Sequence, residues 1–190
     1  MMPMSRRLTF LTCVVTLLAW SAAAAQEPVV AAADPEALFT SPDPKLHANK
    51  QVALHIMRDL LEANHWELAD TYLTAEYHQH NPNVASGRDG VVKYFTATRK
   101  PTPIPAKMKT KIVAVIAEGD LVIVATPREL TDPRNPSKRY TTTWFDMWRI
   151  KDGKADEHWD GATIAPAPAG RSGKVKGAKI RRYAHLRIYL

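Results

Sequence analysis

The most informative stretch of this sequence is residues 144–160, which read WFDMWRIKDGKADEHWD. Apolar and polar side chains alternate on both sides of Asp152-Gly153, a pair that favours a tight turn between two strands. The stretch therefore predicts a β-hairpin, and the antiparallel sheet to which this hairpin belongs decides the fold.

The faces of this hairpin depend on its turn, for which two registers are open. A two-residue loop sets Lys151 opposite Lys154. A type I turn with a glycine bulge instead sets Asp146 opposite His158. The residues that share a face with Asp146 are Glu157 and Trp159 in the first register, and Trp144, Trp148, Ile150, Asp156, His158 and Asp160 in the second.

The second register describes a pocket wall, because it interleaves large aromatic rings with acids and an imidazole. Polar groups of this kind are buried only with a partner or a function. Burial beside aromatic rings raises the pKa of a carboxyl group, which suits it to act as a base or an acid near neutral pH. His158 then orients Asp146 or shares its proton. The alternative is an ordinary cross-strand pair of Asp146 and His158, with Asp160 capping a surface turn.

The rest of the chain divides into helices followed by strands. Three helical patterns come first, from Leu46 to Leu61, from Trp66 to about Leu73 and from Val91 to Phe95. Strand patterns follow at residues 107–117, 121–125, 139–151 and 154–163. Helices before strands are typical of the α+β class. We expect three N-terminal helices packed against a curved, cone-shaped antiparallel sheet, with a cavity between the two layers.

A second polar cluster, Tyr77 to Pro82, reads YHQHNP and is predicted to be extended, because a helix is disfavoured just before proline. In an extended segment His78 and His80 point the same way, so with a carboxylate from elsewhere they are candidate metal ligands. The alternative has one imidazole hydrogen-bonded in the pocket wall and the other exposed. We adopt this alternative, and we expect no metal and no cofactor.

The first 25 residues are predicted to be a signal peptide. Arg6 and Arg7 precede an apolar run from Leu8 to Trp20, and the small residues Ala22 to Ala25 follow. The run is shorter than the roughly 18 to 20 residues that span a bilayer, so no transmembrane segment is expected. Cleavage after Ala25 predicts a periplasmic or secreted protein. It also removes Cys13, the only cysteine, which excludes cysteine catalysis and disulfides in the mature chain.

The formal charge of +7 belongs to the end of the chain. From Arg171 to Arg187 there are seven basic residues and no acid; without these, Arg6 and Arg7, 17 of the 26 basic residues remain, against 19 acids. The part before the tail is therefore slightly acidic, and no specific nucleic-acid binding is expected. We assign residues 26–44 to a linker, 45–165 to the domain and 166–190 to a solvated, disordered tail. The alternative for the tail is a basic arm that binds an anionic surface.

Two motifs in this chain resemble those of a known family. They are Tyr77 with Gln79-His80-Asn81-Pro82 and Gly87, and a terminal Asp-x-Trp-Arg-x-x-x-Gly-Lys from Asp146 to Lys154 followed by Glu157-His158-Trp159-Asp160. Together they resemble the SnoaL-like polyketide cyclases of the nuclear transport factor two-like superfamily. The resemblance spans about Lys45 to Gly161 and leaves the basic tail aside.

The resemblance implies a cystatin-like cone with an apolar cavity, often in a homodimer. SnoaL-type cyclases close a polyketide ring by intramolecular aldol condensation without a metal or cofactor, whereas other members of the superfamily only bind ligands. Carried over to this chain, Asp160 would remove a proton next to a carbonyl group, and Asp146, His158 and His80 would hold the enolate and the acceptor oxygen. The residues expected to contact a small apolar or carbonyl-containing ligand are Trp144, Trp148, Tyr77, Asn81 and Tyr94. The alternative function is a binding or accessory module that uses the same pocket without turnover.

Overall fold

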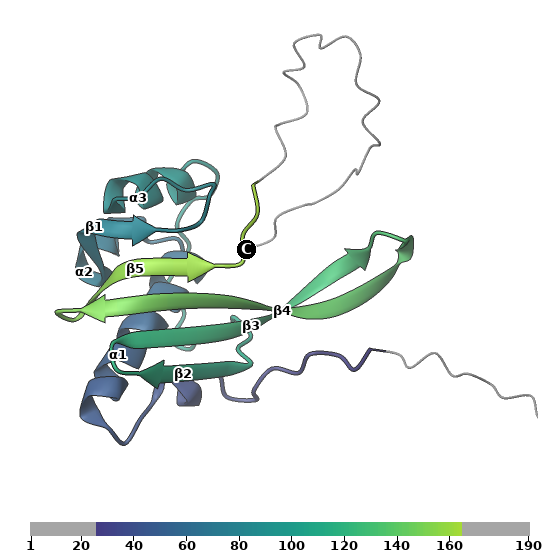
Figure 1. Ribbon diagram of the computed structural model, residues 1–190, viewed down its shortest axis with the longest axis horizontal. Coiled ribbons are helices and arrows are strands. Elements are labelled where there is room, and N and C mark those ends of the chain that lie inside the picture. Colours follow the sequence, from purple (N-terminus) through teal and green to yellow (C-terminus); the bar gives the residue numbers. More distant parts are fainter. Residues whose placement is uncertain (1–25, 165–190) are drawn as a thin grey trace, which may run out of the picture.

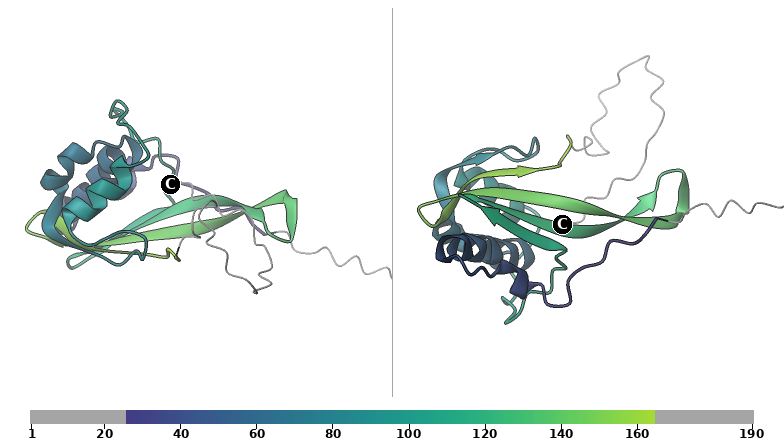
Figure 2. Two further views of the ribbon diagram at one scale, coloured as in Figure 1. Left: turned by 90° about the horizontal axis from the view of Figure 1, so that it is seen from above. Right: turned by 60° about the horizontal axis from the view of Figure 1, so that its bottom comes forward.

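The computed structural model, which describes residues 26–164, shows three α-helices against one face of a five-stranded sheet (Figures 1 and 2). The helices precede all strands except β1, which lies between the second and third helices. The α-helices are α1 (Pro44–His55), α2 (Ala69–Tyr72) and α3 (Arg88–Thr96), and shorter helical segments are η1 (Glu36–Phe39), η2 (Ile56–Glu62) and η3 (Trp66–Leu68). The strands are β1 (Leu73–Gln79), β2 (Ala114–Glu118), β3 (Leu121–Asp132), β4 (Asn135–Lys151) and β5 (Lys154–Asp160). The predicted α+β class is confirmed.

The five strands lie in the order β1-β5-β4-β3-β2. Neighbours from β5 to β2 are antiparallel, as predicted, but β1 runs parallel to β5, with Leu73 beside Ala155 and His78 beside Glu157. The sheet is therefore mixed rather than wholly antiparallel. The sequence pattern indicates that residues 77–81 are extended, but alternation within one strand carries no information on the direction of its neighbour.

The first helix begins and ends at residues whose side chains favour those positions. The carboxylate of Asp43 accepts a hydrogen bond from the Leu46 N–H at 2.9 Å, and Pro44 occupies the first turn. The helix continues as the π-helix η2 and stops near Asn64, which has a φ of 62°. The residues that α1 and η2 bury in the hydrophobic core are Ala53, Leu54, Ile56, Met57 and Leu60.

Residues 26–44, expected to be a linker, take part in the fold. Phe39 in η1 has no exposed surface and lies in the main hydrophobic cluster. Upstream of it, the Ala32 N–H donates to the Ile112 carbonyl at 2.8 Å, and the Val29 N–H donates to the Thr141 hydroxyl at 2.8 Å. The composition of the segment predicts a linker, but the burial of its one aromatic ring packs the segment against the domain.

Strands β3 and β4 are longer than predicted, and their far halves form a two-stranded hairpin arm, residues 126–144, that projects from the domain (Figure 1). Pro127 is the reason that the sequence pattern appeared to end at Ala125. The structure accommodates this proline opposite Thr143, because β2 pairs with β3 only as far as Ala125 and leaves β3 with one neighbour beyond it.

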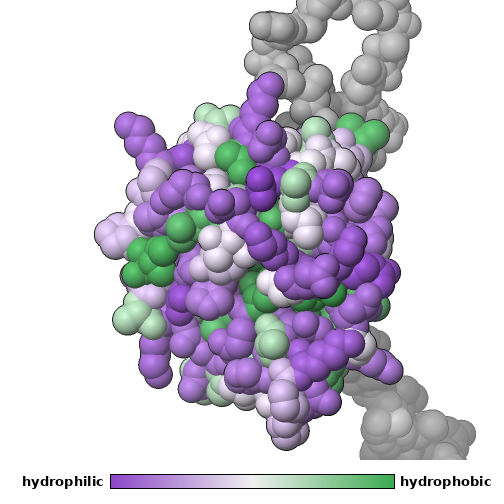
Figure 3. Space-filling view, turned by 90° about the vertical axis from the view of Figure 1, so that its left-hand side faces the viewer, coloured by the Kyte–Doolittle hydropathy of each residue, from purple (hydrophilic) through white to green (hydrophobic). Residues whose placement is uncertain are grey.

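The end of the domain away from the hairpin arm has a mostly hydrophilic surface with apolar atoms in separate patches (Figure 3). The main hydrophobic cluster combines buried residues of the helices and the sheet. None of the helices within residues 26–164 is both long enough and apolar enough to cross a membrane. The predicted signal peptide and basic tail lie outside the described residues.

Candidate active site

The hairpin of β4 and β5 turns through a two-residue loop. Asp152 and Gly153 have φ angles of 51° and 76°, and Lys151 lies opposite Lys154. Positive φ at both central positions is the requirement of a type I′ turn, which aspartate and glycine meet at low cost. At the turn itself, therefore, the first of the two predicted registers is the one that forms.

A β-bulge directly after this turn exchanges the faces of β5. Ile150 lies opposite Ala155, but Arg149 lies opposite Glu157, so Asp156 is an extra residue in the strand. Beyond the bulge the pairs are Trp148 with His158 and Asp146 with Asp160. The inner face beyond the bulge therefore holds the residues predicted for the second register, including Asp146, His158 and Asp160. Asp156, the bulged residue, is not among them.

Between this inner face and the helices lies a cavity of about 560 Å³. The helical side contributes mainly Ile56, Met57, Leu61, Trp66, Val91, Tyr94 and Phe95, and the sheet side contributes Leu73, Tyr77, Gln79, Thr126, Arg128, Trp144, Asp146, Trp148, His158 and Asp160. A volume of this size suits a small-molecule ligand, and the walls are largely apolar.

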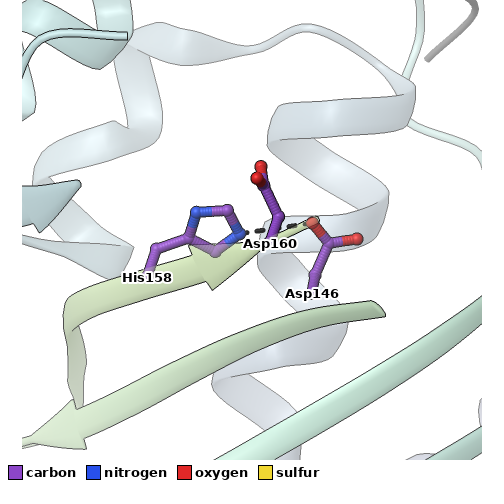
Figure 4. Close-up of side chains that lie close together, drawn as sticks. All are labelled: Asp146, His158 and Asp160. Carbon is purple, nitrogen blue, oxygen red and sulfur yellow. Dashed lines mark hydrogen bonds and ion pairs between the residues drawn. The ribbon is translucent and has the colours of Figure 1, made fainter. Parts of the chain in front are cut away.

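Three ionisable side chains meet in the sheet wall of the cavity. Asp146 from β4 and His158 and Asp160 from β5 point toward one another (Figure 4), and one ligand atom from each lies within 4.8 Å of the others. The Nε2 atom of His158 is 3.2 Å from the Oδ1 atom of Asp146, and the exposed fractions of these side chains are 8% and 14%. The wall therefore holds a polar cluster in a setting with little water.

The hydrogen bonds of His158 determine where its protons lie. The Oε1 atom of Gln79 accepts a hydrogen bond from the Asn81 N–H at 3.0 Å, so it is the oxygen of that amide, and the Nδ1 atom of His158, 2.8 Å away, must donate to it. The Nε2 atom then faces Asp146 Oδ1, which also accepts from Trp144 Nε1 at 3.1 Å. An unprotonated nitrogen and a carboxylate are both acceptors, so this contact is a hydrogen bond when one proton lies between Asp146 and His158.

Asp160 is oriented by the chain on either side of the cavity. One oxygen accepts from the Asn81 side-chain amide at 2.7 Å, and the other accepts from the Ala162 N–H at 2.8 Å. Each carboxylate oxygen keeps a second lone pair. Asp160 is therefore fixed in direction but still able to accept a proton or a hydrogen bond from a ligand.

Tyr77 provides a hydroxyl group at the base of the cavity. Its oxygen accepts a hydrogen bond from Trp148 Nε1 at 3.1 Å, and the residue is only 3% exposed. Burial, with smaller contributions from the charges of Asp146 and Asp160, raises the pKa of Tyr77 far above its usual value. The hydroxyl consequently keeps its proton and can donate a hydrogen bond to an oxygen atom of a ligand.

Asp146, His158 and Asp160 are also the described residues that could hold a metal ion. Two carboxylates and one imidazole are a common donor set for divalent cations. A cation at this point would displace a proton that lies between Asp146 and His158. Metal binding and this hydrogen bond would therefore exclude each other.

The five residues expected to contact a ligand all line the cavity: Tyr77, Asn81, Tyr94, Trp144 and Trp148. His80 is the exception among the predicted site residues. It pairs with Glu157 at 2.8 Å, stacks on Trp159 and is half-exposed on the outer face. Alternation along β1 explains this correction, because Tyr77 and Gln79 face the cavity and the histidines between and after them face outward.

Two residues of the site were not identified from the sequence. Gln79 follows Tyr77 at a two-residue interval in an extended segment, and this spacing contained the signal that it faces inward. Arg128 lies in the part of β3 beyond Pro127, where the sequence was taken to leave the sheet. No local pattern could have placed it beside the cavity.

Three α-helices against a curved sheet, with a cavity between the two layers, define a protein of the nuclear transport factor two-like superfamily. Within it the chain belongs to the SnoaL-like domain family, whose family model matches residues 54–158. No curated protein matches the sequence.

Solved structures with a similar fold include three bacterial proteins. TsrD from Streptomyces laurentii is 20% identical with a TM-score of 0.41, and the match covers 63% of this chain and 90% of that one. A proposed polyketide cyclase from Bacillus cereus is 20% identical with a TM-score of 0.46, covering 70% and 84%. An NTF2-like protein from Burkholderia pseudomallei is 16% identical with a TM-score of 0.43, covering 61% and 91%.

Proposed function

We propose that this protein is an exported, cofactor-free acid–base enzyme that moves a proton next to the carbonyl group of a small, partly apolar compound, as in an intramolecular aldol closure. The observation that carries the proposal is the 3.2 Å contact between His158 Nε2 and Asp146 Oδ1, beside Asp160, in the wall of the cavity. Proton transfer by positioned side chains is most effective where water is excluded. The SnoaL-like family supports a role in binding or cyclising a small molecule.

In the proposed reaction, Asp160 takes a proton from the carbon next to a carbonyl group, and the Tyr77 hydroxyl donates a hydrogen bond to the resulting enolate oxygen. The enolate carbon attacks a second carbonyl carbon of the same molecule, and a carbon–carbon bond forms. The new alkoxide oxygen takes the proton shared by Asp146 and His158, and Asp160 then returns its proton to that pair. No atom is lost, so the product is an isomer of the substrate.

The test uses a probe that does not require the natural substrate. The wild-type protein should accelerate the exchange of the C1 protons of 2-tetralone for deuterium in D₂O, measured by proton NMR. Asp160→Asn should lower this rate by about two orders of magnitude while the affinity for 2-tetralone stays within about twofold. The matched control is Asp152→Asn, in the turn of the same hairpin, which should leave the rate unchanged. Equal rates for wild type and Asp160→Asn would remove Asp160 from the proposed role.

A binding module without turnover is the second candidate, and one observation favours it. Both oxygens of Asp160 already accept hydrogen bonds from the protein, an arrangement that also serves a purely structural carboxylate. Under this reading 2-tetralone binds the cavity, but the wild-type protein exchanges its protons no faster than the Asp160→Asn variant or buffer does. The same experiment therefore separates the two functions.

Export is supported by the sequence of the first 25 residues, with Arg6, Arg7 and the following apolar run. Cleavage after Ala25 should give a mature chain that begins at Gln26. Intact-mass measurement of the protein from the periplasm or culture medium checks this, and a mass that retains residues 1–25 would contradict it.

A further inference from the structure

Arg128 lies at the outer end of the cavity on the inner face of β3. It is opposite Thr142, two residues further along the strand than Thr126, which is opposite Trp144. Its guanidinium group lies over the Trp144 ring, with the central carbon 3.5 Å from the ring centroid. This contact occupies one flat face of the guanidinium group and leaves the N–H groups around its edge available.

The Arg128 guanidinium makes no hydrogen bond to another residue in the described part of the chain. Its partial burial disfavours the charged form and lowers the pKa of Arg128. The charges of Asp146 and Asp160 act on it in the opposite direction, yet neither carboxylate comes within ion-pair distance of it. A guanidinium group has five N–H donors, and those of Arg128 are open to the solvent of the cavity, where an acceptor group of a ligand can bind them.

The other arginines of residues 26–164 are arranged differently. Each donates to at least one carboxylate or carbonyl oxygen of the protein, as in the pairs of Arg134 with Asp132, Arg139 with Glu129 and Arg149 with Asp120. Those three are surface pairs, on the hairpin arm or at the sheet edge. Arg128 is thus the described arginine that is both in the cavity wall and without an oxygen partner from the protein.

We propose that Arg128, held in place by the Trp144 ring, binds a carboxylate group of the ligand, so that the protein prefers keto acids over neutral ketones of similar size. The planar edge of a guanidinium group matches a carboxylate in a bidentate arrangement that a neutral oxygen cannot fully use. This substrate class rests on the proposed function, because the carbonyl group is placed at Asp160 only if that reaction occurs. The carboxylate site itself does not depend on turnover.

The Trp144 side chain sets the distance between the two ends of the ligand. Its Nε1 atom donates to Asp146 Oδ1 at 3.1 Å, and its ring centroid is 3.5 Å from the central carbon of the Arg128 guanidinium group. Asp146 and Arg128 therefore contact the same indole ring. A short keto acid can place its carboxylate at Arg128 and its carbonyl group near the polar cluster.

The experiment compares two probes that differ only in this charge, benzoylacetate and its methyl ester. Binding to the full mature chain is followed by quenching of tryptophan fluorescence. The wild-type protein should bind the acid at least about tenfold more tightly than the ester, and added salt should weaken only the acid. Arg128→Gln should remove this preference without altering the affinity for the ester. Arg128→Lys, which keeps the charge but loses the planar edge, should give an intermediate preference.

The matched control is Arg134→Gln, on the tip of the hairpin arm, which should retain the full preference for the acid. Equal binding of acid and ester by the wild-type protein overturns the proposal, as does a preference that survives in Arg128→Gln. Failure of the proposed function is recognised separately, because in that case 2-tetralone exchange is absent while the preference for the acid persists.

Discussion

His158 is the residue on which the polar cluster depends, because both of its ring nitrogens are committed to neighbours. Gln79 holds one nitrogen in the donor role, and this leaves the other to share a proton with Asp146. A group that fixes the tautomer of a histidine typically acts through orientation and not through contact with the reacting atoms. Gln79 is therefore a positioning residue.

Replacing Gln79 tests this role at the scale of a single hydrogen bond. Gln79→Leu removes the acceptor for Nδ1 of His158, so the imidazole is expected to exchange between tautomers and the 2-tetralone exchange rate to fall about tenfold to a hundredfold. In protein labelled with ¹⁵N-histidine, the Nδ1 resonance of His158 should move away from the position of a protonated nitrogen. Gln79→Glu keeps an acceptor and should restore most of the activity.

His80→Gln is the control, because this imidazole is on the outer face and pairs with Glu157. It should leave both the His158 resonance and the exchange rate unchanged. A Gln79→Leu variant with the wild-type spectrum and rate would show that Gln79 does not determine the tautomer.

At the scale of elements, the π-helix η2 is held by a buried carboxylate. Asp59, 3% exposed, accepts hydrogen bonds from Arg58 Nε at 2.8 Å and from the Tyr72 hydroxyl at 3.0 Å, and it pairs with His55 at 2.9 Å. Burial by itself would raise the pKa of Asp59, but the hydrogen bonds from Arg58, His55 and Tyr72 outweigh it and hold the pKa below its ordinary value. Its charge thus links η2 to α2.

Stability should follow the charge of Asp59. A carboxyl group whose pKa is lower in the folded state stabilises that state above its unfolded pKa, and this contribution is lost as the pH falls through the lower, folded value. Asp59→Asn should therefore reduce the free energy of unfolding by about 2 to 4 kcal/mol at pH 7, and by less at pH 3. Urea unfolding at both values measures this. Asp70→Asn, an exposed carboxylate on α2, is the control, and an equal loss at both pH values would contradict the charge-based explanation.

The bulge at Asp156 shows how far the sequence can predict this site. Alternation and turn chemistry correctly predicted a hairpin at Asp152-Gly153 and an inner face with aromatic residues, acids and an imidazole. With the two-residue turn alone, His158 would face outward. Asp156 bulges out of β5, and its carboxylate accepts a hydrogen bond from the Thr74 hydroxyl at 2.8 Å. Thr74 and Asp156 are 82 residues apart in the sequence. Such a contact depends on the parallel placement of β1, which no local pattern contains.

At the scale of the whole molecule, the helices cover only one face of the sheet (Figure 2). On the opposite face Ile116 of β2 is 60% exposed and Phe145 of β4 is 56% exposed. Large apolar side chains that remain in water on an open sheet are typical of a surface that another protein covers. We propose that a second copy of this chain covers this face, in the homodimer that the family resemblance implies.

The dimer is tested by placing charge on this face. The mature wild-type chain should have twice the monomer mass by light scattering at micromolar concentration, and the double variant Ile116→Glu, Phe145→Glu should have the monomer mass, because a carboxylate buried without a partner is strongly unfavourable. Tyr140→Glu changes an aromatic residue of similar chemistry on the other face of β4 and should remain dimeric. A wild-type chain with the monomer mass would rule out this interface.

The position of Phe39 limits where the N-terminal side of the protein can be shortened. Its ring fills part of the core although the residue precedes the first α-helix, so a truncated chain that starts at Lys45 would leave a void the size of a benzene ring. Removal of a buried phenylalanine side chain typically costs about 3 to 5 kcal/mol, a large share of the stability of a domain of this size. A tag or fusion partner is therefore best joined upstream of η1, where the whole aromatic anchor is retained.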